Sequence, residues 1–207
     1  MELAPHHLLR IRGMEDLFSG SPFPGWVAEA LHHAPWVVVR RATESGRVPV
    51  GVRGRERGQR FAAWLSPDKI LETIPPSALV DPASWKMSYP AGPPQPLQSL
   101  RQITPFLQDT GYSWGPTGSL AFELATGYPS IKESSDLDIL LDVPAPITVA
   151  AARSLLAGIE IVSLVRLDVQ MNTPAGGVAL KEYCTADRVL VKTATGPILL
   201  AGPALWE

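Results

Sequence analysis

Proline is concentrated in one short segment of this 207-residue chain, and that segment limits how the chain can fold. The stretch SYPAGPPQPLQS, residues 88–99, holds four of the 21 prolines. Proline fixes φ and lacks a backbone donor, so this stretch cannot continue a helix or a central strand. We therefore expect one domain over residues 1–88, a Pro-rich linker over 89–98 and a second domain over 99–207.

The residues before the linker predict a small N-terminal α+β domain. Strands are expected at 7–11, 36–41, 48–54 and 59–66, where apolar and β-branched residues are enriched. Residues 24–34 predict a short helix. Ser66 followed by Pro67 is a helix-start signal and predicts a second helix over 66–74.

The residues after the linker predict helices interleaved with strands. Helices are expected at 97–111, where Pro105 would kink or end the helix, at 119–127 with Gly127 as its stop, and at 147–158 ending at Gly158. Strands are expected at 135–142, 160–171, 188–193 and 197–202. This order predicts a small mixed sheet with helices, and the fold class of the whole chain is α+β.

Charge and composition exclude several classes of function. A formal net charge of −2 gives no summed basic field, so neither a nucleic acid nor a membrane is expected as a partner. Any phosphate binding must then come from a local cluster of residues. A single cysteine, Cys184, forbids an internal disulfide, and the sequence has no signal-peptide pattern and no apolar run of membrane-spanning length. We expect a cytoplasmic protein.

Two acids lie at alternate positions of one predicted strand. Side chains alternate faces along a strand, so Asp136 and Asp138 point one way while Leu137 and Ile139 enter the core. Two adjacent carboxylates repel, and a divalent cation removes that conflict. Oxygen-only ligands suit Mg²⁺, which keeps waters and accepts phosphate oxygens. The alternative is a solvated strand end, with Asp142 as a further surface acid.

A Gly-Ser pair precedes these acids at the start of a predicted helix. Gly118 permits a tight backbone, and Ser119 lies where the first helical N–H groups are free to hold an anion. Ser119 would serve simply as an N-cap in most proteins. Glu123, one helical turn later, either caps this helix start or approaches the same site.

A third acid, Asp168, lies within the apolar strand predicted at 160–171. An acid in such a strand needs a partner, and a metal shared with Asp136 and Asp138 would supply one. A salt bridge to Arg166 or another arginine is the alternative.

Gly-Ser at a helix start, acid-x-acid on a strand and one acid on a later strand together resemble the signature of the polymerase-β-like nucleotidyltransferase superfamily. A closer resemblance spans essentially the whole chain. The block WGPTGSLAFELATG followed by SDLDILL, with VPVGVRG and QRFAAW nearer the N-terminus, is similar to the malonate decarboxylase holo-acyl-carrier-protein synthase family, also called phosphoribosyl-dephospho-CoA transferase.

The resemblance implies a definite reaction. The donor is 2′-(5″-triphosphoribosyl)-3′-dephospho-CoA, and the acceptor is a serine of the acyl-carrier subunit of malonate decarboxylase. Pyrophosphate is released. Asp136, Asp138 and Asp168 would bind Mg²⁺ or Mn²⁺, with Asp168 holding a second metal or accepting the serine proton, while Ser119 and N–H groups near Gly118 hold the phosphates. Two alternatives stay open: transfer of an NMP group from an ordinary NTP, and a noncatalytic domain that binds the carrier protein.

Basic residues gather in one glycine-rich segment. VRGRERGQR carries Arg53, Arg55, Arg57 and Arg60, and arginine forks match phosphate oxygens. Strand alternation favours Arg53 and Arg57 as substrate-binding residues, against the alternative of a solvated hairpin loop. Lys181 and Lys192 are further candidates for phosphate contacts, although either is also an ordinary surface lysine.

Overall fold

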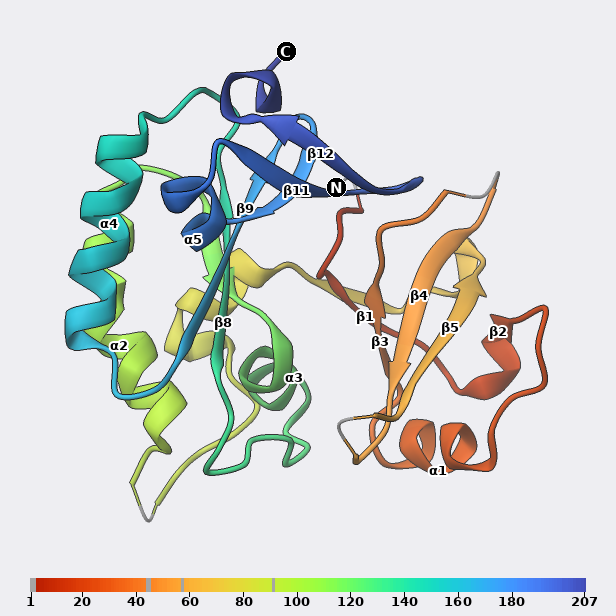
Figure 1. Ribbon diagram of the computed structural model, residues 1–207. Coiled ribbons are helices and arrows are strands. Elements are labelled where there is room, and N and C mark those ends of the chain that lie inside the picture. The colour runs from red at the N-terminus through yellow and green to blue at the C-terminus, as the bar shows by residue number, and fades with distance from the viewer. Residues whose placement is uncertain (1–2, 44–45, 57, 91) are drawn as a thin grey trace.

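The computed structural model describes residues 3–43, 46–56, 58–90 and 92–207 of the chain. It contains two sheets, each packed with helices, and lies in two domains side by side (Figure 1). The predicted α+β class is confirmed. In the part of the chain that is described, every helix is too short or too polar to traverse a lipid bilayer.

The first domain is built on an antiparallel sheet. Its six described strands follow the order β2-β5-β4-β3-β1-β6. In β4 the alternation predicted from sequence is observed, because Val48, Val50 and Val52 are buried and pack with Val27 and Leu31 of α1. The elements are β1 (Leu8–Arg10), η1 (Met14–Asp16), β2 (Leu17–Phe18), α1 (Gly25–His33), β3 (Trp36–Val39), β4 (Val48–Arg53), β5 (Arg60–Leu65), η2 (Pro67–Lys69) and β6 (Glu72–Ile74).

The helix predicted over 66–74 is wrong. Pro67 does begin a 3₁₀ turn, but the turn ends at Lys69, and residues 72–74 form β6. This strand pairs with β1, where Glu72 lies opposite Arg10 and their side chains form an ion pair of 2.9 Å. Long-range strand pairing therefore overrides the local helix-start signal.

The second domain is built on a mixed sheet. Its strands, among the residues described, follow the order β12-β11-β10-β9-β8-β7, and β8 and β9 are parallel. Figure 1 shows α2 and α4 on the far side of this sheet and α3 between the sheet and the first domain. The elements are η3 (Pro76–Val80), η4 (Pro82–Ser84), α2 (Gln95–Gln108), β7 (Trp114–Pro116), α3 (Gly118–Thr126), β8 (Leu137–Asp142), α4 (Val149–Val162), β9 (Leu167–Thr173), β10 (Gly176–Ala179), α5 (Leu180–Thr185), β11 (Arg188–Thr193), β12 (Gly196–Ala201) and η5 (Gly202–Leu205).

Several predicted boundaries in this domain are displaced. Helix α4 does not end at Gly158 but continues to Val162, so the strand predicted over 160–171 begins only at Leu167. Gly158 faces the Phe106 ring of α2, and a side chain there would lie 3.1 Å from that ring. Close packing of two helices explains a glycine inside α4. Pro105 does not end α2, whose last residue is Gln108.

Candidate active site

Two aspartates lie next to each other on the parallel strands of the second sheet. In the register of β8 and β9, Asp138 is paired with Asp168. Paired residues of adjacent strands project to the same face, so the two side chains leave the sheet together, while Leu137 and Ile139 on the opposite face are buried. Asp136 precedes the first residue of β8, two positions before Asp138.

The N-terminus of α3 is packed directly against Asp138. The backbone N–H of Thr117 donates to the Asp138 carbonyl at 2.8 Å, and Thr117 is the N-cap residue of the helix. Gly118 has φ of 64°, and a side chain there would overlap the Asp138 carboxylate. Only glycine suits both the left-handed backbone and this close approach. The first free N–H groups of α3 therefore lie beside a carboxylate-bearing strand.

Ser119 is not the N-cap of α3 but its second residue. Its hydroxyl oxygen accepts a hydrogen bond from the Arg53 guanidinium of the first domain. This bond joins the Gly-Ser turn to the arginine-rich hairpin, two motifs that the sequence analysis had selected separately.

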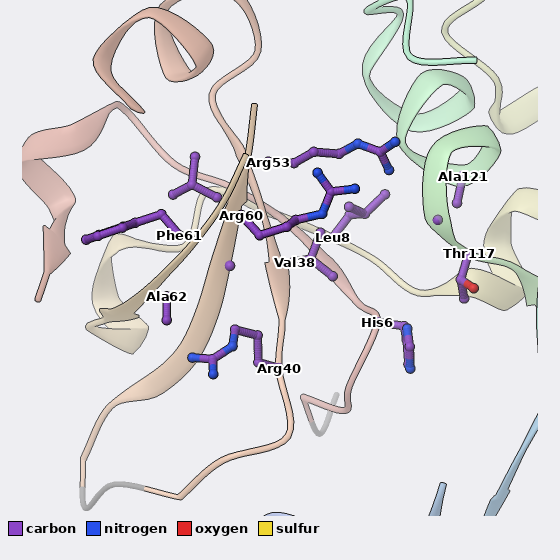
Figure 2. Close-up of a pocket in the computed structure, with 13 residues that line it drawn as sticks. His6, Leu8, Val38, Arg40, Arg53, Arg60, Phe61, Ala62, Thr117 and Ala121 are labelled. Carbon is purple, nitrogen blue, oxygen red and sulfur yellow. The ribbon is translucent and has the colours of Figure 1, made fainter. Parts of the chain in front are cut away.

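Two arginines of the first domain face the Gly-Ser turn. Arg53, the last residue of β4, is paired across the hairpin with Arg60, the first residue of β5, and both side chains reach toward α3 (Figure 2). Burial, and then the charge of Arg60, lowers the pKa of Arg53 to about 10, and the charge of Asp138 opposes the shift. The sequence placed Arg60 in the arginine cluster but did not favour it as a substrate-binding residue. The register of the hairpin would have placed it opposite Arg53. Arg57 lies outside the described residues.

A cleft of two chambers lies between the domains. The polar chamber, about 320 Å³, holds Asp136, Asp138 and Ser119 together with three more serines and the basic residues of both domains. The apolar chamber, about 490 Å³, is walled by the first sheet and the start of α3. Arg53, Arg60 and Gly118 line both chambers. The remaining residues that line the polar chamber are Arg55, Glu56, Ser130, Lys132, Ser134, Ser135. The remaining residues that line the apolar chamber are His6, Leu8, Val38, Arg40, Gly51, Val52, Phe61, Ala62, Thr117, Ala121.

Glu123 anchors the loop that leads to Asp136. Its buried carboxylate accepts hydrogen bonds from the backbone N–H groups of Ser130 and Ile131, at 2.6 and 2.7 Å, and from the Tyr89 hydroxyl at 2.9 Å. Burial, and then Glu123 itself, raises the pKa of Tyr89. Glu123 therefore positions one wall of the polar chamber and does not cap the start of α3.

The two lysines selected from the sequence lie elsewhere. Lys181, on α5, forms an ion pair of 3.6 Å with Glu160 of α4 and lines neither chamber. Lys192, on β11, donates to the Gln170 side chain of β9 at 3.3 Å and likewise lines neither chamber. Lys132, which the sequence analysis passed over, is the lysine that the polar chamber contains.

A small polar network joins the domains at the far end of this sheet face. The His6 and Gln170 side chains lie 3.1 Å apart, and Arg41 donates to Asn172 at 3.0 Å. Burial, and then the charges of Arg41 and Lys192, lower the pKa of His6 to about 4. The imidazole is therefore neutral at pH 7.

The carboxylates of the polar chamber are the candidate metal ligands. In the described ranges, no three His, Cys, Asp or Glu side chains lie close enough to enclose a cation. Asp136 instead lies 3.9 Å from Arg166, an exposed contact of little energetic weight. Asp136 and Asp138 nevertheless open into one chamber with serine and arginine side chains. Such a set suits a cation that takes its remaining ligands from water and phosphate, as Mg²⁺ does.

This arrangement defines a class of protein: a two-domain α+β protein whose cleft combines a helix N-terminus, strand carboxylates and arginines of the facing domain. Helix N-termini and arginines are groups that suit phosphate oxygens. Comparison with known families then identifies the chain. The family model described as "Phosphoribosyl-dephospho-CoA transferase MdcG C-terminal domain" matches residues 84–203, and the corresponding N-terminal domain matches residues 4–76. The chain belongs to the phosphoribosyl-dephospho-CoA transferase family, which confirms the resemblance found in the sequence.

Curated relatives agree with this assignment. The chain is 44% identical to the phosphoribosyl-dephospho-CoA transferase of Pseudomonas fluorescens over 182 residues, which cover 87% of this chain and 85% of the relative. It is 42% identical to that of Pseudomonas putida, covering 96% and 94%. The Klebsiella pneumoniae transferase is 37% identical, covering 86% and 85%. No solved structure matches the chain.

Proposed function

We propose that this protein transfers the 2′-(5″-triphosphoribosyl)-3′-dephospho-CoA group to a serine of the acyl-carrier subunit of malonate decarboxylase. The serine Oγ attacks the α-phosphorus, a new P–O bond forms, and the bond from the α-phosphorus to the bridging oxygen of the β-phosphate breaks. Pyrophosphate leaves, and the serine proton passes to a base. We place the reaction in the cytoplasm, where the buried thiol of Cys184 would remain reduced.

Each proposed role follows from where the residue lies. Asp136 and Asp138 would hold Mg²⁺ or Mn²⁺, which when bound neutralises phosphate charge. Asp168, beside Asp138, would bind a second ion or accept the serine proton. Ser119 and the free N–H groups after Gly118 would hold the β- and γ-phosphates. Arg53 and Arg60 would stabilise the charge that develops on the phosphate oxygens as the bond breaks.

The observation that carries the proposal is the contact between the Gly-Ser turn and Asp138. Gly118 leaves room for a carboxylate at the start of α3, and a carboxylate there repels an anion unless a cation lies between them. A triphosphate with a bound metal ion supplies both the anion and the cation. The arginines of the first domain face the same point, so the donor would be enclosed between the domains.

Intact-mass spectrometry of the carrier subunit tests the proposal. The purified chain, Mg²⁺ and the apo carrier are incubated with triphosphoribosyl-dephospho-CoA in one arm and with ATP in the other. We expect the carrier to gain the mass of the phosphoribosyl-dephospho-CoA group in the first arm alone, with release of pyrophosphate. A carrier that gains an AMP group from ATP instead would replace this function with ordinary nucleotidyl transfer.

A further inference from the structure

The apolar chamber is lined by residues that phosphate binding does not explain. Its walls come from four strands of the first sheet and from the start of α3, and its volume of about 490 Å³ lies within the range of roughly 300–1,000 Å³ for small-ligand sites. The apolar side chains on the cleft face of the sheet and on α3 are Leu8, Val38, Ala62 and Ala121, whereas Val52 and Phe61 line the chamber from a face whose side chains pack toward α1. None of the lining residues that the structure describes is an acid. The chamber suits a largely apolar group with a few polar edges.

The chamber also has polar groups at defined points on its walls. Thr117 and His6 are on the side of the second domain, and Figure 2 places Arg40 on the opposite side of the chamber from Arg53. Arg40 is exposed and also lines a neighbouring pocket of about 320 Å³. The chamber therefore has the Arg53–Arg60 pair at its junction with the polar chamber and a third arginine at its other end.

We propose that the apolar chamber binds the adenosine part of the donor, with Arg40 contacting the 5′-diphosphate that leads to pantetheine. This inference rests on the proposed function. A single ribose joins the reacting α-phosphate to the 2′-oxygen of the adenosine. With the triphosphate in the polar chamber, that ribose crosses the junction lined by Arg53, Arg60 and Gly118. The adenosine, with its own ribose and purine, is the next group along the molecule and enters the chamber beyond.

The proposal assigns a substrate role to the N-terminal domain. The second domain supplies the carboxylates and the helix N-terminus, whereas most residues that line the apolar chamber belong to β1, β3, β4 and β5 or adjoin these strands. Recognition of the donor as a nucleotide would then depend on the first domain, and its activation on the second.

A substitution that fills the chamber tests the proposal by binding measurements. Ala62 lies at an exposed position of β5 and lines the apolar chamber but not the polar chamber. Ala62→Trp therefore reduces the volume of the apolar chamber without changing the core or the polar chamber. Ala62→Ser is the matched control, because it keeps the chamber open. Calorimetry with dephospho-CoA and, separately, with Mg²⁺ and inorganic triphosphate gives the two affinities.

We expect Ala62→Trp to weaken dephospho-CoA binding by about tenfold or more, as when an apolar group loses its pocket, with triphosphate binding within about twofold of wild type. Ala62→Ser should leave both affinities unchanged. Equal dephospho-CoA affinity in all three proteins would overturn the proposal. If dephospho-CoA binding is lost as expected but the wild type attaches no group to the carrier, the proposed function fails while this site stands.

Photolabelling of the wild-type chain with 8-azido-dephospho-CoA gives a second test that needs no variant. We expect the azidoadenine to label peptides that contain β3, β4 or β5, and unmodified dephospho-CoA to prevent the labelling. Labelling confined to peptides that contain the polar-chamber loop, residues 128–136, would place the base elsewhere and overturn the proposal.

Discussion

The two sheets place their functional side chains in opposite ways. In the first, an antiparallel hairpin sets Arg53 across from Arg60, two like charges from residues seven positions apart. In the second, a parallel pair sets Asp138 beside Asp168, two like charges from residues thirty positions apart, with α4 between their strands. Asp138 and both arginines line the polar chamber, so opposite charges from the two domains face each other there. A phosphate site in this cleft would therefore need both domains, the arginines of the first and the helix N-terminus of the second.

The largest effect should come from removing one carboxylate of the second sheet. Asp138→Asn keeps the shape of the side chain but loses its charge, so we expect group transfer to fall about a thousandfold or more with little change in thermal stability. The assay is carrier mass, with circular dichroism for folding.

The matched control is Asp142→Asn, farther along the same strand face, where Asp142 accepts from Asn172 at 3.1 Å. Transfer by Asp142→Asn should stay near wild type. Substantial transfer by Asp138→Asn would show that the Asp138 carboxylate is not needed for the reaction.

Gly118→Ala should have the next largest effect. A methyl group there strains the left-handed backbone and displaces the Asp138 carboxylate, so we expect about a hundredfold slower transfer. Gly111→Ala is a close control, since Gly111 has φ of 70° and open space around its Cβ position. Both variants should lose about 1–2 kcal/mol of stability, measured by denaturant unfolding, from backbone strain alone. Equal transfer rates for the two variants would show that the Asp138 contact is irrelevant.

Removing one arginine of the first sheet should cost less. Arg60→Ala leaves Arg53 in place, and we expect Mg²⁺-triphosphate to bind about tenfold more weakly, the usual contribution of a charge-assisted hydrogen bond. Lys181→Ala, whose lysine pairs with Glu160, should bind as wild type. Calorimetry at two salt concentrations measures both. A stronger effect from Lys181→Ala would mean that the phosphates lie on α5 and that the arginine pair has another role.

Glu123→Gln should mainly lower the stability of the protein, because Glu123 anchors the loop that forms one wall of the polar chamber. The carboxylate accepts two backbone N–H groups and the Tyr89 hydroxyl, and an amide replaces part of that acceptor with a donor. We expect a loss of about 2–4 kcal/mol in the free energy of unfolding, with a rise in KM larger than the fall in kcat. Tyr89→Phe removes one bond of the three and should cost about 1 kcal/mol. A Glu123→Gln variant of wild-type stability would contradict the anchoring role.

The smallest effect concerns the polar network at the far end of the cleft. Because the pKa of His6 is about 4 in the folded protein, below its ordinary value of 6.5, the unfolded chain binds the proton more readily between these values. The contribution of neutral His6 to the free energy of unfolding is complete above pH 6.5 and is lost as the pH falls toward 4. The melting temperature of wild type should fall by a few degrees more than that of His6→Asn between pH 7 and 4.5. Parallel falls would show that His6 is not buried in its neutral form.

Local patterns in the sequence were sufficient for part of this site. The Gly-Ser helix start, the Gly127 stop and the strand alternation that sends Asp138 away from the core all depend on residues within a few positions of one another. The metal ligands and the bound phosphates stay predictions. The domain boundaries also stay predictions, although α2 begins at Gln95, inside the segment expected to be a linker.

What the sequence determined by itself was therefore the set of reactive residues and the short-range geometry that presents them. The tertiary structure decided which of them meet. In the folded protein, Asp168 is paired with Asp138, and Arg60 lies opposite Arg53 and faces the Gly-Ser turn. Glu123 anchors a loop, and Lys181 forms an ion pair away from the cleft. The physical reason is that strand register and domain packing depend on contacts between distant segments, which the spacing of residues along one segment does not encode.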